Sequence, residues 1–366
     1  MKAIQRIGVL TGGGDCPGLN AVIRGVVKAV MHKHGADVFG FYDGYRGLVL
    51  GEGKWLEWND VSGILTVGGT ILGTTNRDNP FAFVDNHAEP NRKRDASPDV
   101  VAHYRKLKLD ALVAIGGDGT LQCAYQLSKR GLNIVGVPKT IDNDVCGTEL
   151  TFGFNTAFTT ATDAVDKLHT TAASHHRVMI VEVMGRTAGW LALTAGLAGG
   201  GDVVLIPEIP YRLKPICEKL RERARRGKNF TIIVISEGAR QANGHVVVRE
   251  RVEGSFEAVR LGGISAVLAK QIEEQSGVET RYTILGHLQR GGTTTPFDRL
   301  LATQFATGAV ELLARHRFNR MVCLRGGRIG SVPLSVPGKA PRLVSPRSPI
   351  IQTARSIGTC FGDETD

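Results

Sequence analysis

The sequence predicts an α/β protein of two doubly wound domains with mainly parallel sheets, and three observations lead to this class. Short apolar runs alternate with helical segments along most of the 366 residues. Several of these runs are Val, Ile or Leu at nearly every position, which is typical of parallel strands covered on both faces. The length exceeds that of one ordinary core and suits two domains.

The expected elements follow in chain order. The apolar runs predict strands at 5–11, 37–41, 110–115, 133–137, 178–183, 202–206, 230–235 and 281–285. Helices are expected between and after them, at 18–33, 120–130, 156–170, 187–198, 213–226, 262–275 and 298–315. Residues 331–366 hold five of the 14 prolines, so we expect an extended tail with one short helix there.

The composition excludes several classes of protein. The net charge is +10, but the cations are scattered and no basic stretch is interleaved with aromatic residues, which argues against nucleic acid binding. The six cysteines lie far apart and form no CxxC pair. No signal peptide and no apolar run of about 18 residues is present. We therefore expect a cytoplasmic protein that binds neither membranes nor nucleic acid. The positive charge is expected to serve the binding of small anionic substrates.

The candidate site lies after the expected strands, because ligands of doubly wound sheets bind beyond the carboxyl ends of strands. Six such segments combine glycine with charged or polar residues, which packing alone would not require. They are TGGGD at 11–15, GGDGT at 116–120, PKTIDND at 138–144, MGR at 184–186, SEG at 236–238 and GHLQRGG at 286–292. Together they predict a convergent polar site.

The first glycine loop favours a phosphate ligand only modestly. No GxxxxGK[ST] motif occurs, and a GxGxxG reading of the loop at 11–15 fails because its third glycine position is Pro17. Backbone amides at a helix start would still favour a phosphate group. A tight turn without a ligand accounts for the three glycines nearly as well.

The segment 116–120 places Asp118 between two glycines directly after a buried strand. A carboxylate there could hold Mg²⁺ that carries phosphates. Gly119 has no side chain, so a ligand could pass close to the backbone. The alternative is a turn in which Asp118 caps the following helix.

The segment 138–144 is the most specific of the six. Asp142 and Asp144 lie so close together at a strand end that packing explains them poorly, since neither could be buried unpaired. Phosphoryl transfer to a hydroxyl needs a carboxylate that accepts the hydroxyl proton, and cations on the phosphate oxygens. Asp142 could supply the first, and Lys139, Arg186 and a metal the second. An Asx-turn with solvated acids is the alternative.

Four arginines fall near the ends of expected strands: Arg177, Arg186, Arg281 and Arg290. The planar guanidinium suits phosphate because it binds two oxygens at once. Any one of them could be a surface residue, but we expect four in matching positions to serve an anionic ligand. His287 lies beside Arg290 and could equally be an ordinary turn histidine.

With GGDGT, PKTIDND, VEVMGR and GHLQRGG in this order, the chain resembles the phosphofructokinase family over roughly residues 5–320. GGDGT alone also resembles NAD kinases and diacylglycerol kinases. The resemblance implies Mg²⁺-dependent phosphoryl transfer to the 1-hydroxyl of fructose 6-phosphate. It also implies a phosphoryl-donor domain of residues 1–150, to which roughly 290–366 return, and a fructose 6-phosphate domain of residues 151–289.

The resemblance carries over particular roles. Asp142 looks like the catalytic base, Arg186 and Thr140 like groups that stabilise the transferring phosphoryl, and Asp118 like the Mg²⁺ ligand. The implied donor-binding residues are Gly14, Arg77, Gly117, Asp118, Gly119, Thr120 and Lys139. The implied substrate-binding residues are Thr140, Asp142, Arg177, Met184, Gly185, Arg186, Glu237, Arg281, His287 and Arg290. Gly14, whose backbone amide would meet the transferring phosphoryl, counts with the catalytic group.

Arg177 and Arg281 resemble the family's arginines that reach in from a neighbouring subunit, which implies a homo-oligomer, a dimer or a tetramer. Arg24 and Lys28 on the first helix resemble effector-site cations of bacterial members, although a solvated helix face explains them equally well.

Two residues bear on the phosphoryl donor, and the chain looks like the mixed-substrate bacterial group of the family. Gly119 leaves room for the α-phosphate of ATP, whereas pyrophosphate-using members resemble GGDDT. Lys139 is typical of pyrophosphate users. Because ATP requires the absence of a clash and tolerates an extra lysine, we expect ATP, with pyrophosphate as the alternative. A non-catalytic sugar-phosphate-binding regulatory protein is the remaining reading, which the presence of Asp142 disfavours.

Overall fold

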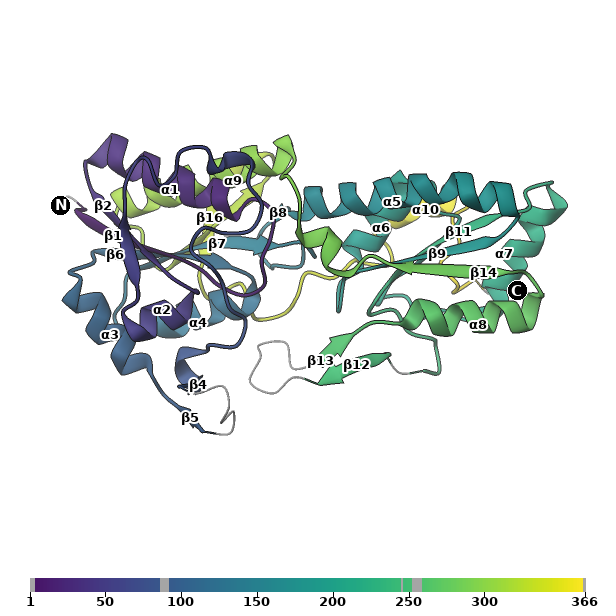
Figure 1. Ribbon diagram of the computed structural model, residues 1–366, viewed down its shortest axis with the longest axis horizontal. Coiled ribbons are helices and arrows are strands. Elements are labelled where there is room, and N and C mark those ends of the chain that lie inside the picture. The colour runs from purple at the N-terminus through teal and green to yellow at the C-terminus, as the bar shows by residue number, and fades with distance from the viewer. Residues whose placement is uncertain (1–3, 86–91, 245, 252–258, 365–366) are drawn as a thin grey trace.

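The computed structural model describes residues 4–85, 92–244, 246–251 and 259–364. Two sheets lie one after the other along the long axis of the molecule, and helices cover both faces of each (Figure 1). The predicted class of a mainly parallel α/β protein is confirmed. No helix in the described ranges is long and apolar enough to cross a membrane.

The first sheet has eight strands in the order β16-β15-β7-β6-β1-β2-β3, and β8 pairs with β7 beside this path. They are β1 (Arg6–Thr11), β2 (Asp37–Phe41), β3 (Gly53–Leu56), β6 (Ala111–Gly116), β7 (Ile134–Thr140), β8 (Phe152–Gly153), β15 (Arg320–Arg325) and β16 (Arg328–Pro333). Only the edge strands β3 and β16 run antiparallel to their neighbours. The strand order places β1, β6 and β7 side by side, so their carboxyl ends share one edge.

Helices cover both faces of the first sheet, and its central strands are therefore buried on both sides. α1 (Leu19–His34) and α9 (Pro296–Ala314) pack together on one face. The other face carries α2 (Tyr45–Leu50), α3 (Ser97–Lys106) and α4 (Asp118–Ser128). The short elements η1 (Ile64–Thr66), η2 (Pro80–Ala82), β4 (Phe83–Val84) and β5 (Lys93–Arg94) lie in the connections.

The second sheet has four parallel strands in the order β10-β11-β9-β14. They are β9 (Val178–Val183), β10 (Val203–Leu205), β11 (Thr231–Ser236) and β14 (Thr280–Ile284). α5 (Phe154–His175) and α6 (Trp190–Ala198) cover one face, and α7 (Leu213–Arg225) and α8 (Ile264–Ser276) cover the other. η3 (Gly286–Arg290) follows β14, and β12 (Val248–Arg251) pairs with β13 (Val259–Leu261) as a separate hairpin.

The C-terminal tail corrects one expectation. We expect roughly residues 290–366 to return to the first domain. α9, β15 and β16 lie there, but after β16 the chain leaves the first sheet and crosses to the second. There α10 (Pro349–Ser356) buries Ile351 and Ala354, and Cys360 extends the edge of the second sheet by pairing with Val203 of β10. The cause is that β10 is an edge strand whose backbone groups need partners, and the tail supplies them: Cys360 O accepts from Val204 N at 2.9 Å.

Candidate active site

The three segments expected to surround the phosphoryl donor meet at the carboxyl edge of the first sheet. Gly12 N donates to Ile115 O at 2.9 Å, which joins the ends of β1 and β6. A Cβ at Gly12 would lie 2.8 Å from the Thr120 side chain, so only glycine lets α4 begin this close to the loop. Gly117 precedes Asp118 and Gly119 in the first turn of that helix. The structure therefore brings together the donor-side residues at 12–14 and 117–120.

The loop that contains Arg77 lies against the same glycine segment. Thr74 Oγ1 donates to Gly13 O at 2.6 Å, and Gly13 N donates to Thr75 O at 3.1 Å. The Arg77 side chain, two residues further on, is exposed. Nothing in the described part of the chain engages its guanidinium, which leaves that group available to an anion beside the loop.

Lys139 crosses from the end of β7 to the glycine loop. Its side chain is buried, and its Nζ donates to the carbonyl of Gly14. Thr140 follows it, and Thr140 Oγ1 accepts from the backbone N–H of Asp142 at 3.0 Å. This bond turns the chain sharply after the strand, so the Asp142 carboxyl is presented at the strand end rather than inside the sheet.

Asp118 is the first residue of α4 and is half-buried. Burial and, second to it, the nearby Asp144 carboxylate raise the pKa of its carboxyl to about 7. Gly338 N donates to Asp118 Oδ1 at 3.3 Å. Two carboxylates that disfavour each other's charge are suited to a divalent cation, although the described residues contain no group of three metal-ligating side chains.

The second sheet contributes the segments at 184–186 and 236–238, because β9 and β11 are adjacent and parallel. Ser236 Oγ donates to Gly185 O, and Gly238 N donates to the same oxygen at 3.2 Å. Gly185 has φ 129°, which favours glycine, and a Cβ at Gly238 would lie 2.0 Å from Arg186 O. Met184 and Glu237 flank this junction, so the structure brings these expected substrate residues together.

Arg186 is half-buried and makes no ion pair with any residue that the structure describes. Its guanidinium is thus free for an anionic ligand. Arg290 connects the segment after the second sheet to the glycine loop of the first: its Nη1 donates to Asp15 O at 2.9 Å and lies 2.6 Å from where a Cβ at Gly14 would be. His287 lies on the same short helix, η3, with its side chain exposed.

Arg177 and Arg281 lie elsewhere, which corrects the expectation of four arginines in matching positions. Arg177 immediately precedes β9, and Arg281 is paired in register with Met179 near the start of that strand. Both are therefore at the amino edge of the second sheet, whereas Met184–Arg186 follow its carboxyl edge. Six residues of strand separate the two edges by ~20 Å, which is beyond the reach of one arginine side chain.

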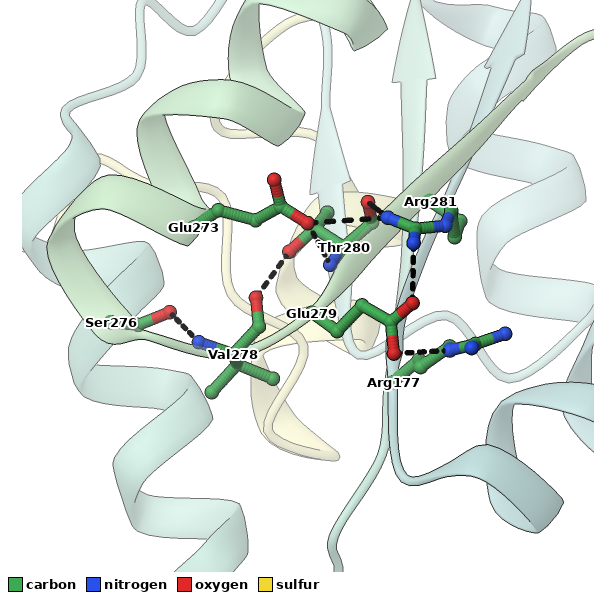
Figure 2. A network of polar contacts seen from close by, with 7 residues as sticks. All are labelled: Arg177, Glu273, Ser276, Val278, Glu279, Thr280 and Arg281. Carbon is green, nitrogen blue, oxygen red and sulfur yellow. Dashed lines mark hydrogen bonds and ion pairs between the residues drawn. The ribbon is translucent and has the colours of Figure 1, made fainter.

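Figure 2 shows what these two arginines contact within the chain. Arg177 Nε lies 2.6 Å from Glu279 Oε2, while Arg281 binds the other oxygen of Glu279 and lies 3.3 Å from Glu273 Oε1. The hydrogen bond from Arg177 lowers the pKa of the Glu279 carboxyl below its usual value. The network leaves Arg281 more than half exposed, with its side chain 53% accessible.

Lys28, one of the two expected effector cations, lies with its Nζ 4.0 Å from the centroid of the Trp58 ring. A cation–π contact thus accounts for this residue within the chain. Sequence reasoning missed Arg342 and Glu208, which contact the loops around Asp144 and Gly189. No local signal marks them, because their partners are far away in the sequence.

Comparison with known proteins agrees with this geometry. The family model described as Phosphofructokinase matches residues 6–313. The protein named ATP-dependent 6-phosphofructokinase in Spirochaeta thermophila is 49% identical over 361 residues, covering 99% of this chain and 98% of the relative. ATP-dependent 6-phosphofructokinase 2 of Clostridium perfringens is 49% identical over 365 residues, covering 99% of this chain and 100% of the relative.

Solved structures agree as well. The crystal structure of Pichia pastoris phosphofructokinase in the T-state matches with a TM-score of 0.77 and 32% identity, covering 92% of this chain and 35% of that chain. The family model spans most of the chain, and the two relatives are matched over nearly their whole length. This chain therefore belongs to the phosphofructokinase family.

Proposed function

We propose that this protein is an ATP-dependent 6-phosphofructokinase, which transfers the terminal phosphoryl group of ATP to the 1-hydroxyl of fructose 6-phosphate. The observation that carries the proposal is the bond from Arg290 to the carbonyl of Asp15. It joins η3, which follows the second sheet, to the glycine loop of the first sheet. The residues expected to bind the sugar phosphate thereby face those expected to bind the donor.

The chemistry follows from the groups that lie where the two sheets meet. Asp142 accepts the proton of the sugar 1-hydroxyl as that oxygen attacks the phosphoryl group. Arg186 and Lys139 place positive charge near the transferring phosphoryl, and the backbone amide of Gly14 is directed at it. Thr140 fixes the turn before Asp142 through its hydroxyl. The groups thus position the reactants, neutralise charge or accept a proton, which is what a loose phosphoryl-transfer transition state requires.

We assign the Mg²⁺ site to Asp118, with Asp144 close by. The fit rests on burial and on the repulsion between the two carboxylates, which together raise the pKa of Asp118 to about 7. A bound divalent cation would remove that repulsion and neutralise charge on the donor phosphates. The proton transfer itself belongs to Asp142, which follows the neighbouring strand β7 of the same sheet.

The donor assignment rests on Gly119 and on the relatives, which are named ATP-dependent 6-phosphofructokinases. Lys139, which had pointed to pyrophosphate, is buried and donates to the carbonyl of Gly14, so it supports the loop in this chain. That role is compatible with ATP. We further propose that the first sheet carries the donor side and the second the fructose 6-phosphate side, in a cytoplasmic homo-oligomer.

The oligomer is supported by the position of Arg177 and Arg281. They lie at the amino edge of the second sheet and cannot reach the ligand bound at its carboxyl edge in the same chain. They could reach the 6-phosphate of a sugar bound to a neighbouring subunit. In this arrangement each complete site contains residues of two subunits, either in a dimer or in a tetramer.

The experiment is an assay of the purified protein with fructose 6-phosphate and Mg²⁺, supplied in parallel with ATP or with pyrophosphate. We expect formation of fructose 1,6-bisphosphate with ATP alone. Turnover with pyrophosphate alone would keep the family and the catalytic residues but reverse the donor assignment. No turnover with either donor would contradict the enzymatic proposal and favour a regulatory sugar-phosphate-binding protein.

A further inference from the structure

The tail segment 338–344, here called the strap, lies across the loop that carries Asp142. At one end Gly338 N donates to Asp118 Oδ1 at 3.3 Å. At the other end Val344 N donates to Glu208 Oε1 at 2.8 Å, and Glu208 also accepts from Gly189 N at 3.0 Å. The strap thus connects the first turn of α4, which covers the first sheet, to the start of α6, which covers the second.

Arg342, in the middle of the strap, holds two consecutive peptide groups next to Asp142. Its backbone N–H donates to Asp144 O at 2.6 Å, and its Nε donates to Asn143 O at 3.2 Å. Asn143 has φ 53°, in the left-handed region that asparagine adopts more readily than most residues. On its other side, Asn143 Oδ1 accepts from Thr151 N at 3.0 Å. The turn after Asp142 is therefore fixed from two sides.

Arg342 is itself held in one orientation. Its guanidinium carbon lies 4.2 Å from the centroid of the Trp190 ring, and Trp190 Nε1 donates to Arg342 O at 2.7 Å. Trp190 begins α6, four residues after Arg186. Burial lowers the pKa of the Arg342 guanidinium, and the charge of Asp144 opposes that effect. The arginine therefore connects the turn after Asp142 to the helix that follows the Arg186 segment.

We propose that Arg342 is a positioning residue for phosphoryl transfer, which holds the 142–144 turn so that the Asp142 carboxyl faces the sugar hydroxyl. This inference rests on the proposed function of the site. The Arg342 side chain acts through its bond to Asn143 O and its contact with the Trp190 ring. The bonds of its backbone to Asp144 and Trp190 remain when the side chain is replaced. A 1 Å displacement of a reacting carboxylate can cost about 100-fold in rate, so a bond to its turn has kinetic consequences.

The kinetic experiment compares Arg342→Gln, Arg342→Lys and wild type. We expect Arg342→Gln to lower kcat at least tenfold while the KM for fructose 6-phosphate changes less than threefold, because the sugar phosphate is bound by other residues. Arg342→Lys keeps the charge and one donor, and we expect it to recover part of the loss. The matched control is Arg347→Gln, an exposed arginine of the same tail, which should behave as wild type.

Hydrogen exchange provides a readout that does not depend on activity. Amides of residues 142–151 should exchange faster in Arg342→Gln than in wild type and in Arg347→Gln, while those of β11 stay unchanged. Trp190→Phe removes the hydrogen bond to Arg342 O but keeps the Arg342 guanidinium and an aromatic ring beside it. This variant should show a smaller change in the same direction.

Two results would overturn this inference: unaltered exchange at 142–151, or a kcat within twofold of wild type in Arg342→Gln. A wild-type protein that shows no phosphofructokinase activity would instead overturn the proposed function. The exchange data would still report whether Arg342 holds the turn.

Discussion

Asp142 owes its position to the chain on both sides of it. The Thr140 hydroxyl accepts its backbone N–H, and the left-handed Asn143 follows it. The preceding strand, β7, is buried at nearly every position, so the turn that carries the carboxyl is held rigidly. Phosphoryl transfer depends on such positioning more than on covalent chemistry by the protein.

We expect Asp142→Asn to lower turnover at least 100-fold, because the amide cannot accept the hydroxyl proton. The binding of fructose 6-phosphate, measured by calorimetry, should stay within threefold of wild type, since the amide fills the same space. Asp163→Asn, on the exposed face of α5, is the control and should be fully active. Turnover of Asp142→Asn within tenfold of wild type would refute the assignment of the base.

Asp118 gives the Mg²⁺ requirement a pH dependence. Burial and then Asp144 raise the pKa of its carboxyl to about 7, so in the metal-free protein it holds a proton below that pH. A cation binds the ionised form and must displace this proton. We therefore expect the Mg²⁺ concentration for half-maximal turnover to rise by about tenfold per pH unit below pH 7 and to level off above it.

The measurement is a Mg²⁺ titration of turnover at pH 6, 7 and 8 with saturating substrates. The same linkage has a sign for stability: a carboxyl whose pKa is raised by folding favours the folded state at low pH, and this contribution is lost as pH rises through 7. An equal Mg²⁺ requirement at pH 6 and pH 8 would show that Asp118 does not bind the metal.

Among the elements, α8 and β9 are joined by one buried carboxylate. Glu182, near the end of β9, accepts from Gly263 N at 2.8 Å and from Ser265 N at 2.9 Å, and also from the Ser265 hydroxyl. The first amides of a helix have no partner within it, and their positive partial charge favours an anion. The start of α8 therefore fixes the strand that ends just before Met184.

We expect Glu182→Ala to lower the free energy of unfolding by about 3 kcal/mol, because three buried donors lose their acceptor at once. The midpoint of urea unfolding, followed by circular dichroism, measures the effect. Glu274→Ala is the control on the same helix: Glu274 is exposed and forms only a surface pair with Lys270, so we expect about 0.5 kcal/mol or less. Similar midpoints for the two variants would contradict this role of Glu182.

Local patterns explain which elements could be predicted. All eight expected strands occur within a few residues of their predicted bounds, because short continuous runs of Val and Ile such as TIIVIS of β11 are typical of parallel strands buried on both faces. The strands β3, β15 and β16 are not among those expected. Exposed positions break the apolar run in the edge strands β3 and β16, and the buried run of β15 is only three residues long.

The site residues were predictable where a charged side chain directly follows an apolar strand in the sequence, as at Asp118 and Asp142. It was not predictable where the partner is remote in the sequence: Gly338 meets Asp118 across 220 positions. Arg177 and Arg186 show a second reason why a site residue could not be predicted from the sequence. Arg177 and Arg186 both flank β9, but only the direction of the strand in the folded sheet separates their environments.

At the scale of the whole molecule, the exposed edge of the second sheet is unusual for a monomer. β14 is an edge strand, and four of its five residues are exposed, including Tyr282 at 48% and Ile284 at 46%. Leu288 on the following η3 is 69% exposed. An uncovered edge strand with apolar side chains pairs readily with another chain. Arg281 lies on the same strand, so a subunit interface here would carry the arginine pair with it.

This arrangement predicts complementation between two defective subunits. In a two-fold symmetric pair, each site would take Asp142 from one chain and the arginine pair from the other. A hybrid of an Asp142→Asn chain and an Arg177→Gln/Arg281→Gln chain then contains one site with both defects and one with neither. Random pairing of equal amounts should restore about a quarter of wild-type activity, because half of the pairs are hybrids with one intact site each.

The measurement is turnover after co-expression of the two variants, compared with each variant alone and with a mixture prepared under conditions that prevent subunit exchange. The arginine double variant alone should show a raised KM for fructose 6-phosphate and an unchanged KM for ATP, whereas Arg315→Gln, at an exposed arginine directly after α9, should change neither. Recovery in the co-expressed sample but not in the unexchanged mixture requires that sites be shared between chains. A double variant with a normal KM for the sugar phosphate, or co-expression without recovery, would mean that each chain completes its own site and that Arg177 and Arg281 serve only the network around Glu279.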